Sequence, residues 1–437
     1  MHGIEKEYPK VLIISHNLFD ITNNVGKTLV SLFEGWPKDK IAQIYFRNDS
    51  PSFKYCKEYY CITDKEIIQS VLTLRIKSAG KEVNNESVQD ISEAEQHLYR
   101  IGNHRRPFIC LVRDLIWRIA KWRTDELKIW LKSVNPDIIL FVPDNYCLAY
   151  RFALWVKEIC PIPIIPFHMD DTFYYGRKTG FVDLHRRKSI FSLAKRLEQN
   201  SNIIFTICNA MSKEYEGLLG IPCQDFMNSV KIDKNRISNI AESDKVIFSY
   251  FGNLHNNRWK SLTEIAEALQ NLDIKDRHIE LRVFSRSKLD PKMKQMFEKK
   301  KIIKYMGDVP ETDLEKWRAD SDILIYVEAF DQQSINSLRL SLSTKIPEYL
   351  ASGICIFAYA SEEFASIQYI KDNYIGFVCI KKEELNNKLL DAIYNIELRQ
   401  RYAQKGLIIA SKNHNIISES CVFQQKIIEQ AAGECNE

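Results

Sequence analysis

Two successive series of short apolar runs constrain the fold of this 437-residue chain more than any other feature of its sequence. Each run is rich in β-branched and aromatic residues and does not alternate with polar ones, which is typical of strands buried on both faces of a parallel sheet. The first series comprises residues 11–15, 41–46, 137–142, 162–167 and 202–207, and the second comprises residues 245–251, 279–284, 302–306, 322–327, 354–359 and 376–380.

Segments with helical spacing lie between these runs, including residues 145–159, 261–269 and 311–319. Strands that alternate with helices predict an α/β protein built from doubly wound, Rossmann-like sheets. A polar, exposed insertion is expected over residues 78–90.

The pattern restarts after the polar stretch 232–245, and the chain is too long for one ordinary core, so we expect two domains. The first should span residues 1–240 and the second residues 241–414. A helix at about 415–437 is expected to pack back onto the first domain.

Charge and composition narrow the classes of partner and compartment. The formal net charge of +4 favours anionic small ligands or a membrane surface over a nucleic acid. The 11 cysteines are scattered without a C-x-x-C pair, which predicts buried thiols in a reducing cytoplasm and no zinc site. The first ten residues lack the apolar segment of a signal peptide, and no run reaches membrane-spanning length. We therefore expect a cytoplasmic protein, at most peripheral at the inner membrane face.

Candidate site residues follow the strands, because ligands of open α/β sheets bind outside the carboxyl ends of the strands. Gly26 follows the first run and predicts either a loop that approaches a ligand or an ordinary turn. His168 and Asp170 follow the fourth run, and they share a face if the strand continues. They could bind sugar hydroxyls or move a proton, or Asp170 and Asp171 could simply stabilise a turn.

The first strand of the second series ends in another polar cluster. Gly252 predicts a tight turn there, and Asn253 follows it. Arg258 and Lys260 come before the next helix, where two cations could bind a diphosphate. Solvated surface charge is the alternative for both.

The stretch S-T-K-I-P-E-Y-L-A-S-G, residues 343–353, is typical of a short helix. Thr344 is expected to cap it, and Gly353 suits the position after its last turn. Lys345 and Glu348 share a face near its start, where the lysine could bind phosphate and the glutamate ribose hydroxyls. The alternative is a surface ion pair between the two.

A basic amphipathic segment covers residues 109–123, with Leu111, Leu115, Ile119 and Trp122 at helical spacing. Such a helix could lie in a lipid interface with its tryptophans at the depth of the headgroups. A core helix is the alternative.

With these motifs together, the chain resembles retaining glycosyltransferases of the GT-B fold, in the family 4-like group. K-I-P-E-Y-L-A-S-G carries most of the resemblance, and residues 207–222, 251–254 and 305–327 add to it. It implies two Rossmann-like domains facing a central cleft. It also implies transfer of a sugar, with retention, from a nucleotide sugar to a saccharide or lipid-linked acceptor in cell-surface polysaccharide biosynthesis. It implies no metal and no separate cofactor.

The resemblance also implies roles for single residues. Glu348 would hold the donor ribose, and Arg258, Lys260 and Lys345 would face the diphosphate. Gly26, Gly252 and Asn253 would lie near the donor, and His168 near the transferred sugar.

Leu340 departs from the family pattern, because many members carry a glutamate eight residues before the Glu348 position. Glu328 and Asp331 lie upstream and are candidates to substitute for it. The departure keeps a non-catalytic nucleotide-sugar-binding subunit open, and a GT-B-like nucleotide-sugar epimerase is a further alternative. The sequence does not indicate the donor base, the sugar or the acceptor.

Overall fold

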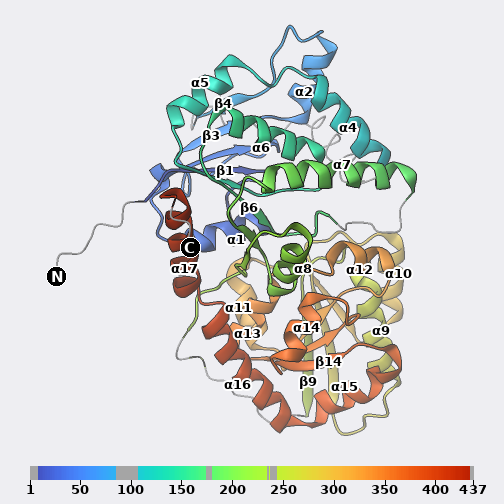
Figure 1. Ribbon diagram of the computed structural model, residues 1–437. Helices are drawn as coiled ribbons and strands as arrows, with labels where there is room; N and C mark the ends of the chain where they lie inside the picture. The colour runs from blue at the N-terminus through green and yellow to red at the C-terminus, as the bar shows by residue number, and fades with distance from the viewer. Residues whose placement is uncertain (1–7, 85–106, 174–179, 234–235, 237–243, 434–437) are drawn as a thin grey trace, which may run out of the picture. The chain divides into compact units, whose positions relative to one another are not determined.

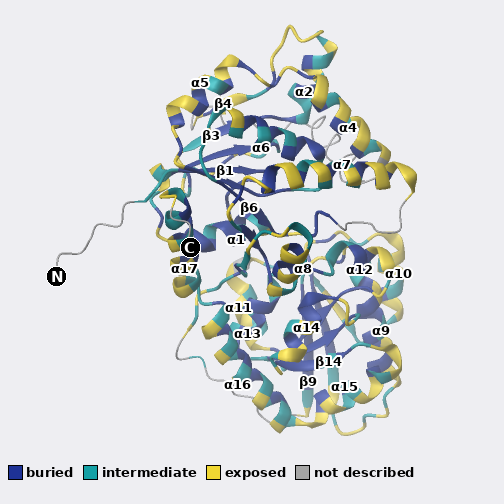
Figure 2. Ribbon diagram, in the orientation of Figure 1, coloured by how far each residue is buried: buried dark blue, intermediate teal, exposed yellow. Residues whose placement is uncertain are grey.

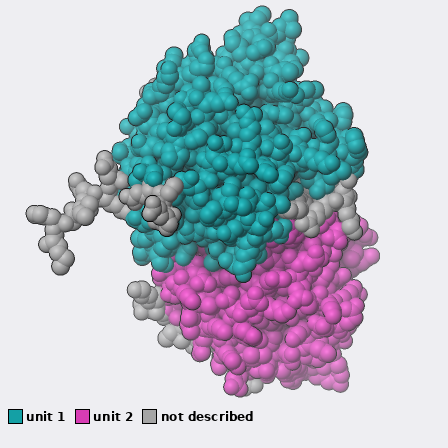
Figure 3. Space-filling model, viewed as in Figure 1, with its two compact units in different colours: residues 1–227, 417–437 teal, residues 228–416 magenta. Residues whose placement is uncertain are grey.

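The computed structural model describes residues 8–84, 107–173, 180–233, 236 and 244–433. The chain divides into two compact units (Figure 3). Unit 1 comprises residues 1–227 and 417–437, and unit 2 comprises residues 228–416. Each unit contains one sheet with helices on both of its faces (Figure 1).

The sheet of unit 1 has eight strands in the order β4-β3-β2-β1-β5-β6-β7-β8. All of its strands pair in parallel except β4, which runs antiparallel to β3. The strands are β1 (Val11–Ser15), β2 (Ile41–Tyr45), β3 (Glu58–Cys61), β4 (Lys81–Val83), β5 (Ile138–Phe141), β6 (Ile164–His168), β7 (Ile204–Thr206) and β8 (Cys223–Asp225). The helices are α1 (Asn24–Leu32), α2 (Asp64–Leu72), α4 (Pro107–Ile119), α5 (Asp125–Val134), α6 (Cys147–Ile159), α7 (Phe181–Glu198), α8 (Asn209–Leu219) and α17 (Ile416–Ala431).

The sheet of unit 2 is parallel throughout, in the order β11-β10-β9-β12-β13-β14. The strands are β9 (Lys245–Phe251), β10 (His278–Phe284), β11 (Ile303–Gly307), β12 (Ile323–Val327), β13 (Cys355–Tyr359) and β14 (Gly376–Cys379). The helices are α9 (Arg258–Asn271), α10 (Pro291–Lys299), α11 (Glu311–Ala319), α12 (Gln332–Leu338), α13 (Lys345–Ala351), α14 (Ala365–Asp372), α15 (Leu385–Tyr394) and α16 (Ile396–Asn413).

Every predicted strand is present, and this confirms the α/β class with two Rossmann-like sheets. The central strands are buried along their whole length, as β1, β5 and β12 show, so the apolar runs reflect burial on both faces (Figure 2). The sequence did not indicate β3, β4 and β8, which are short. The predicted exposed insertion over residues 78–90 contains the edge strand β4, in which Lys81 and Glu82 are exposed as expected and Val83 is buried. Residues 85–90 lie outside the described part.

The C-terminal helix α17 packs within unit 1. Its Gln424 side chain donates to the carbonyl oxygens of Leu32 and Glu34, at 3.2 and 2.8 Å. These carbonyls lie at and just after the end of α1, where no intrahelical donor remains. Phe423 is fully buried, with its ring 5.2 Å from that of Phe33 and 5.1 Å from that of Phe226. Hydrogen bonds from Gln424 and an aromatic cluster around Phe423 thus hold α17 within unit 1.

The chain passes between the two units at two places, near residues 228–230 and near residues 414–416, and these two segments are hydrogen-bonded to each other. Val230 donates its backbone N–H to the His414 carbonyl at 2.8 Å, and Ile416 donates to the Val230 carbonyl at 3.0 Å. The His414 ring donates from Nδ1 to the carbonyl of Asn228 at 2.9 Å. Residues 228–230 therefore belong to unit 2, whereas the sequence placed the division near residue 240.

Candidate functional site

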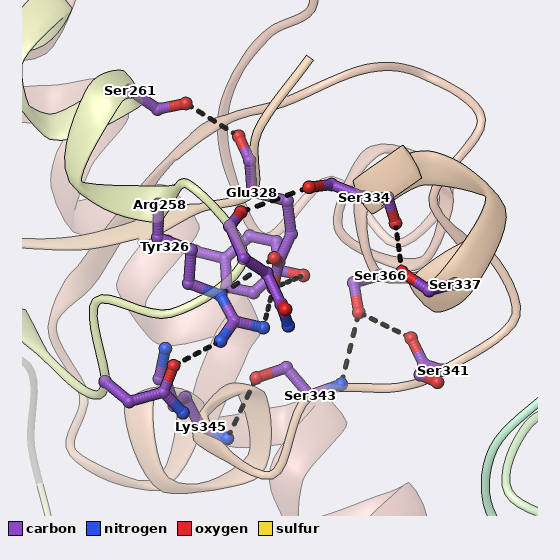
Figure 4. A network of polar contacts seen from close by, with 12 residues as sticks. Arg258, Ser261, Tyr326, Glu328, Ser334, Ser337, Ser341, Ser343, Lys345 and Ser366 are labelled. Atoms are coloured by element: carbon purple, nitrogen blue, oxygen red, sulfur yellow. Dashed lines mark hydrogen bonds and ion pairs between the residues drawn. The ribbon is translucent and has the colours of Figure 1, made fainter. Parts of the chain in front are cut away.

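The sheet order of unit 2 places a candidate site at β9 and β12. The chain proceeds from β9 outward to β10 and β11, and from β12 in the opposite direction to β13 and β14. Neighbouring strands whose connections diverge leave a crevice beyond their carboxyl ends, and doubly wound folds bind ligands there. Arg258 follows β9, Glu328 follows β12, and Lys345 begins α13 (Figure 4).

Arg258 is held by a two-pronged ion pair with Glu328. Its Nε lies 2.8 Å from Glu328 Oε2, its Nη2 lies 2.8 Å from Oε1, and its Nη1 donates to Asn253 Oδ1 at 2.6 Å. The two charged side chains are only 11% and 4% exposed. Burial by itself disfavours the charged guanidinium, but the Glu328 carboxylate outweighs it and raises the pKa of Arg258. Arg258 is therefore a fixed cation.

Lys345 lies in a narrow slot beside β9. Its Nζ donates to the Tyr250 hydroxyl at 3.1 Å and lies 4.6 Å from the centre of that ring. A Cβ on residue 252 would overlap Nζ and Cε of Lys345, so the slot requires Gly252. Burial, and then the positive charge of Arg258, lower the pKa of Lys345 to about 7. The carboxylates of Glu328 and Glu348 act in the opposite direction, but they do not offset these two effects.

Glu348 lies one turn further along α13 and pairs with Arg318, whose Nη1 donates to Glu348 Oε2 at 3.0 Å. The hydrogen-bond partners of Lys345 and Glu348 are thus Tyr250 and Arg318. The alternative of a surface ion pair between Lys345 and Glu348 is wrong, because each side chain turns to a different strand or helix.

The start of α13 also differs from its prediction. Thr344 stands at the N-cap position, but its hydroxyl makes no capping hydrogen bond, because its backbone is already helical. Ser343 takes that role, accepting from the N–H of Lys345 on its Oγ at 3.4 Å and from that of Ile346 on its carbonyl at 3.1 Å. The Tyr349 hydroxyl then ties α13 to β9, accepting from the Phe251 N–H at 3.1 Å.

Three further residues named from the sequence lie outside this cluster. Leu340 is buried, so the position eight residues before Glu348 holds an apolar side chain. Asp331 caps α12 by accepting from the Ser334 N–H at 3.0 Å. Lys260 is exposed, and its Nζ lies 5.8 Å from the centre of the Trp259 ring.

In unit 1, strand β6 ends at His168, so the alternation that would place His168 and Asp170 on one face does not extend to Asp170. His168 is fully buried, with Nε2 2.8 Å from Glu198 Oε1 and Nδ1 3.2 Å from Thr172 Oγ1. Asp170 is exposed. Their catalytic roles stay predictions, and the contacts of His168 are those of a residue that orders the end of β6.

Gly26 lies in the first turn of α1, where its N–H donates to the Asn23 side chain at 2.8 Å. A Cβ there would overlap the Asp20 carbonyl and lie 2.6 Å from that of Leu18. The glycine thus allows α1 to pack against the loop before it, which is what an ordinary strand-to-helix turn requires. A role near the donor stays a prediction.

The sequence did not indicate one pair of polar residues in unit 1. The pair lies at the carboxyl ends of β1 and β5, which are neighbours in their sheet as β9 and β12 are in theirs. His16 follows β1 and Asp144 follows β5, with Nδ1 and Oδ2 3.5 Å apart. Both side chains are partly exposed, at 26% and 19%. The two residues are 128 positions apart, and only the strand order brings them together.

The basic segment 109–123 forms α4 and the turn after it. Its tryptophans lie inward, with Trp117 Nε1 donating to Asp64 Oδ1 at 2.7 Å and Trp122 Nε1 to the Trp117 carbonyl at 2.8 Å. The prediction that these tryptophans lie at headgroup depth is wrong, because both are buried. Leu111, Leu115 and Ile119 form an exposed stripe instead.

Two other features, a membrane-spanning helix and a metal site, are not found among the described residues. None of their helices is both long enough and apolar enough to cross a membrane. Within the same residues, no group of three or more His, Cys, Asp or Glu is placed to hold a metal ion.

Comparisons with known proteins bear on the fold. No protein-family model matches the chain, and no curated protein matches it in sequence. A structure of Anabaena HepE in complex with UDP and glucose is similar to it, with a TM-score of 0.61 and 12% identity over 98% of this chain and 100% of that one. Sucrose-phosphate synthase from Thermosynechococcus elongatus gives a TM-score of 0.62 at 9% identity over 97% of this chain and 100% of that one. A trehalose-6-phosphate synthase from Burkholderia multivorans gives 0.59 at 10% identity over 98% and 97%. Similarity over nearly the whole length shows that this chain has the GT-B fold.

Proposed function

We propose that this protein is a glycosyltransferase that moves a sugar from a nucleotide-sugar donor to a saccharide or lipid-linked acceptor. One observation carries the proposal. Arg258, Lys345 and Glu348 come together where β9 and β12 diverge, at the point where this fold binds ligands. The similarity to a structure that holds UDP and glucose supports the same reading.

The cluster suits a nucleoside diphosphate that departs with its negative charge. Arg258 would present a fixed guanidinium, oriented by Glu328 before the donor arrives. Lys345 would take up a proton as the diphosphate approaches, because its pKa of about 7 leaves it largely neutral in a mildly basic solution. Preorganised cations stabilise the leaving group in the transition state more than they stabilise the bound donor.

Glu348 would bind the donor ribose. Its Oε2 accepts from Arg318, which fixes the carboxylate, and its Oε1 would accept from a ribose hydroxyl. His168 and Asp170 are proposed to act from unit 1, His168 by ordering the end of β6 and Asp170 as the exposed group beside it. Gly252 and Asn253 would shape the donor slot.

We further propose that the transfer proceeds with retention and that the acceptor belongs to cell-surface polysaccharide assembly at the cytoplasmic face of a membrane. In a retaining transfer the acceptor hydroxyl attacks from the side of the departing phosphate, and a phosphate oxygen helps to take its proton. Such a step depends on stabilising charge more than on a strong base, which suits a site with two cations.

A non-catalytic nucleotide-sugar-binding subunit is the second candidate. Leu340 favours it, because the position holds a buried apolar side chain where many similar enzymes carry a carboxylate toward the donor sugar. Glu328 does not replace that carboxylate freely, since Arg258 occupies both of its oxygens. Release of nucleoside diphosphate on adding an acceptor separates transferase from subunit, and sugar isomerisation without acceptor would identify an epimerase.

Thermal-shift measurements with UDP, GDP, CDP and ADP, each alone and as its common sugar conjugates, test the donor site first. A ligand that binds only the native state raises the apparent stability. We expect a shift with one nucleotide, and Glu348→Gln should reduce the affinity about tenfold through a lost charge-assisted hydrogen bond. Glu298→Gln is the matched control, because Glu298 is an exposed glutamate of α10. No shift with any nucleotide, or equal affinity in Glu348→Gln, would contradict the donor site.

A further inference from the structure

The turn after α2 and the end of α4, with the residues that follow α4, form a basic pocket in unit 1, which the donor site does not use. It has a volume of about 410 Å³ and is lined by Arg75, Arg118, Ile119, Ala120, Lys121 and Arg123. Among the described residues, every charged side chain that lines it is basic. The pocket is built from two segments that are tied together, since Lys121 donates its N–H to Ser70 Oγ at 3.0 Å and Ala79 donates to the Lys121 carbonyl at 2.9 Å.

Apolar side chains project into solvent on both segments that flank this pocket. At the end of α2 and in the turn after it, Leu72, Leu74 and Ile76 are 76%, 87% and 83% exposed. On α4, the stripe of Leu111, Leu115 and Ile119 recurs every four residues and reaches the pocket at Ile119. Figure 2 shows the turn after α2 and the outer face of α4 largely in the colour of exposed residues.

The turn after α2 is ordered in this outward conformation. Arg75 donates its N–H to the Ser70 carbonyl at 2.7 Å, and Ile76 donates to that of Thr73 at 3.0 Å. Leu74 and Arg75 both adopt the left-handed conformation, with φ of 51° and 67°, which side-chain-bearing residues seldom take. The side chains of Leu74 and Arg75 are both exposed. The turn therefore presents a leucine and an arginine to solvent next to each other.

We propose that this surface, the basic pocket with the apolar side chains of residues 72–76 and of α4, docks the protein on an anionic lipid bilayer. Lipid phosphates would bind in the pocket, and Leu74, Ile76 and the α4 stripe would enter the boundary between headgroups and acyl chains. We choose a membrane as the partner because of charge complementarity. The cations would face the negatively charged headgroups of an anionic membrane, and the exposed apolar residues beside them would face its acyl chains. The surface belongs to unit 1 and the donor residues belong to unit 2. The proposal therefore does not rest on the donor site, and a failure of the donor-site test leaves it standing.

Vesicle co-sedimentation of the full chain tests this surface. We compare vesicles of phosphatidylcholine alone with vesicles that also contain phosphatidylglycerol. Binding should require the anionic lipid and should weaken strongly as salt is raised, since screening shortens the reach of surface charge. No binding to anionic vesicles at low salt would overturn the proposal.

Two double variants separate the apolar part from the basic part. Leu74→Ser with Ile76→Ser should lower the partition coefficient about tenfold, because two apolar side chains no longer enter the bilayer. Arg75→Ser with Lys121→Ser should lower binding to anionic vesicles about fivefold for each cation removed. Circular dichroism should show both variants folded, since all four side chains are exposed.

Matched controls use the same residue types elsewhere on the surface. Ile129→Ser with Ile408→Ser removes two isoleucines that are 67% and 65% exposed, and Lys275→Ser with Lys299→Ser removes two exposed lysines. These controls should bind like the unaltered protein. Equal losses in variants and controls would contradict a localised surface. A dimer in light scattering that Leu74→Ser with Ile76→Ser dissolves would assign the surface to a second copy instead and overturn the proposal.

Discussion

The amino group of Lys345 occupies the space that a β-carbon on residue 252 would need. The two residues are far apart in sequence, yet the missing side chain of Gly252 lets the lysine lie against the end of β9 and donate to Tyr250. The position of a candidate phosphate-binding cation thus depends on a glycine in another segment.

Gly252→Ala should therefore displace Lys345 and weaken nucleotide binding about tenfold, the size expected for one charge-assisted hydrogen bond. Isothermal titration with the nucleotide found in the thermal-shift screen measures the change. Gly217→Ala serves as the control, because a Cβ at this position of α8 meets no atom within 4 Å. Unchanged affinity in Gly252→Ala would show that nucleotide binding does not depend on this position of Lys345.

Nucleotide binding should take up protons between about pH 7 and the ordinary lysine pKa near 10.5. Burial and the charge of Arg258 lower the pKa of Lys345 to about 7 in the free protein, so the amine is mostly neutral at about pH 8. A bound diphosphate favours the charged amine and raises that pKa, so the affinity should fall as the pH rises through this window.

Titration at about pH 8 in buffers of different ionisation enthalpy measures this proton uptake. Lys345→Met should abolish it. Uptake of the same size in Lys345→Met would assign the proton to another group.

The ion pair of Arg258 and Glu328 should contribute to stability as well as to the site. Glu328→Gln leaves a buried guanidinium without its counter-charge, so the free energy of unfolding should fall by about 3 kcal/mol. Urea denaturation measures the loss, and the exposed Glu298→Gln should change stability by less than about 0.5 kcal/mol. The double variant with Arg258→Gln should lose less than the sum of the single variants, because the charges act as a pair. Full additivity would show that they are independent.

His414 links the segment near residue 414 to the segment 228–230. It should make the free energy of unfolding depend on pH. The ring is fully buried between the Asn228 carbonyl and the Tyr369 hydroxyl, and burial lowers its pKa from 6.5 to about 4. The unfolded chain therefore binds the proton more readily between these values. The neutral ring supports the fold fully above about pH 6.5, and this support is lost as the pH falls toward 4.

The loss attributable to His414 should approach about 3 kcal/mol across that window. Urea denaturation at several pH values compares His414→Gln with the unaltered protein, and the variant should show a correspondingly weaker decline. The exposed His255→Gln should leave the decline as it is. An identical decline in His414→Gln would mean that other groups carry it.

The sequence by itself determined most strands of the two sheets, but not β3, β4 and β8. A central strand of a parallel sheet is covered on both faces, so its residues must be apolar without interruption, and this signal is local. The helix beginning at Lys345 was equally visible, because proline near its start and glycine after its end are local signals too.

Only the tertiary structure decided which of the polar residues act together. Arg258 meets Glu328 because β9 and β12 are neighbours, and Glu348 meets Arg318 rather than Lys345. The order of strands in a sheet, and with it the partner of each side chain at a strand end, depends on how helices pack across the whole unit. No local pattern records that order, so the sequence indicated the candidate residues but not their pairing.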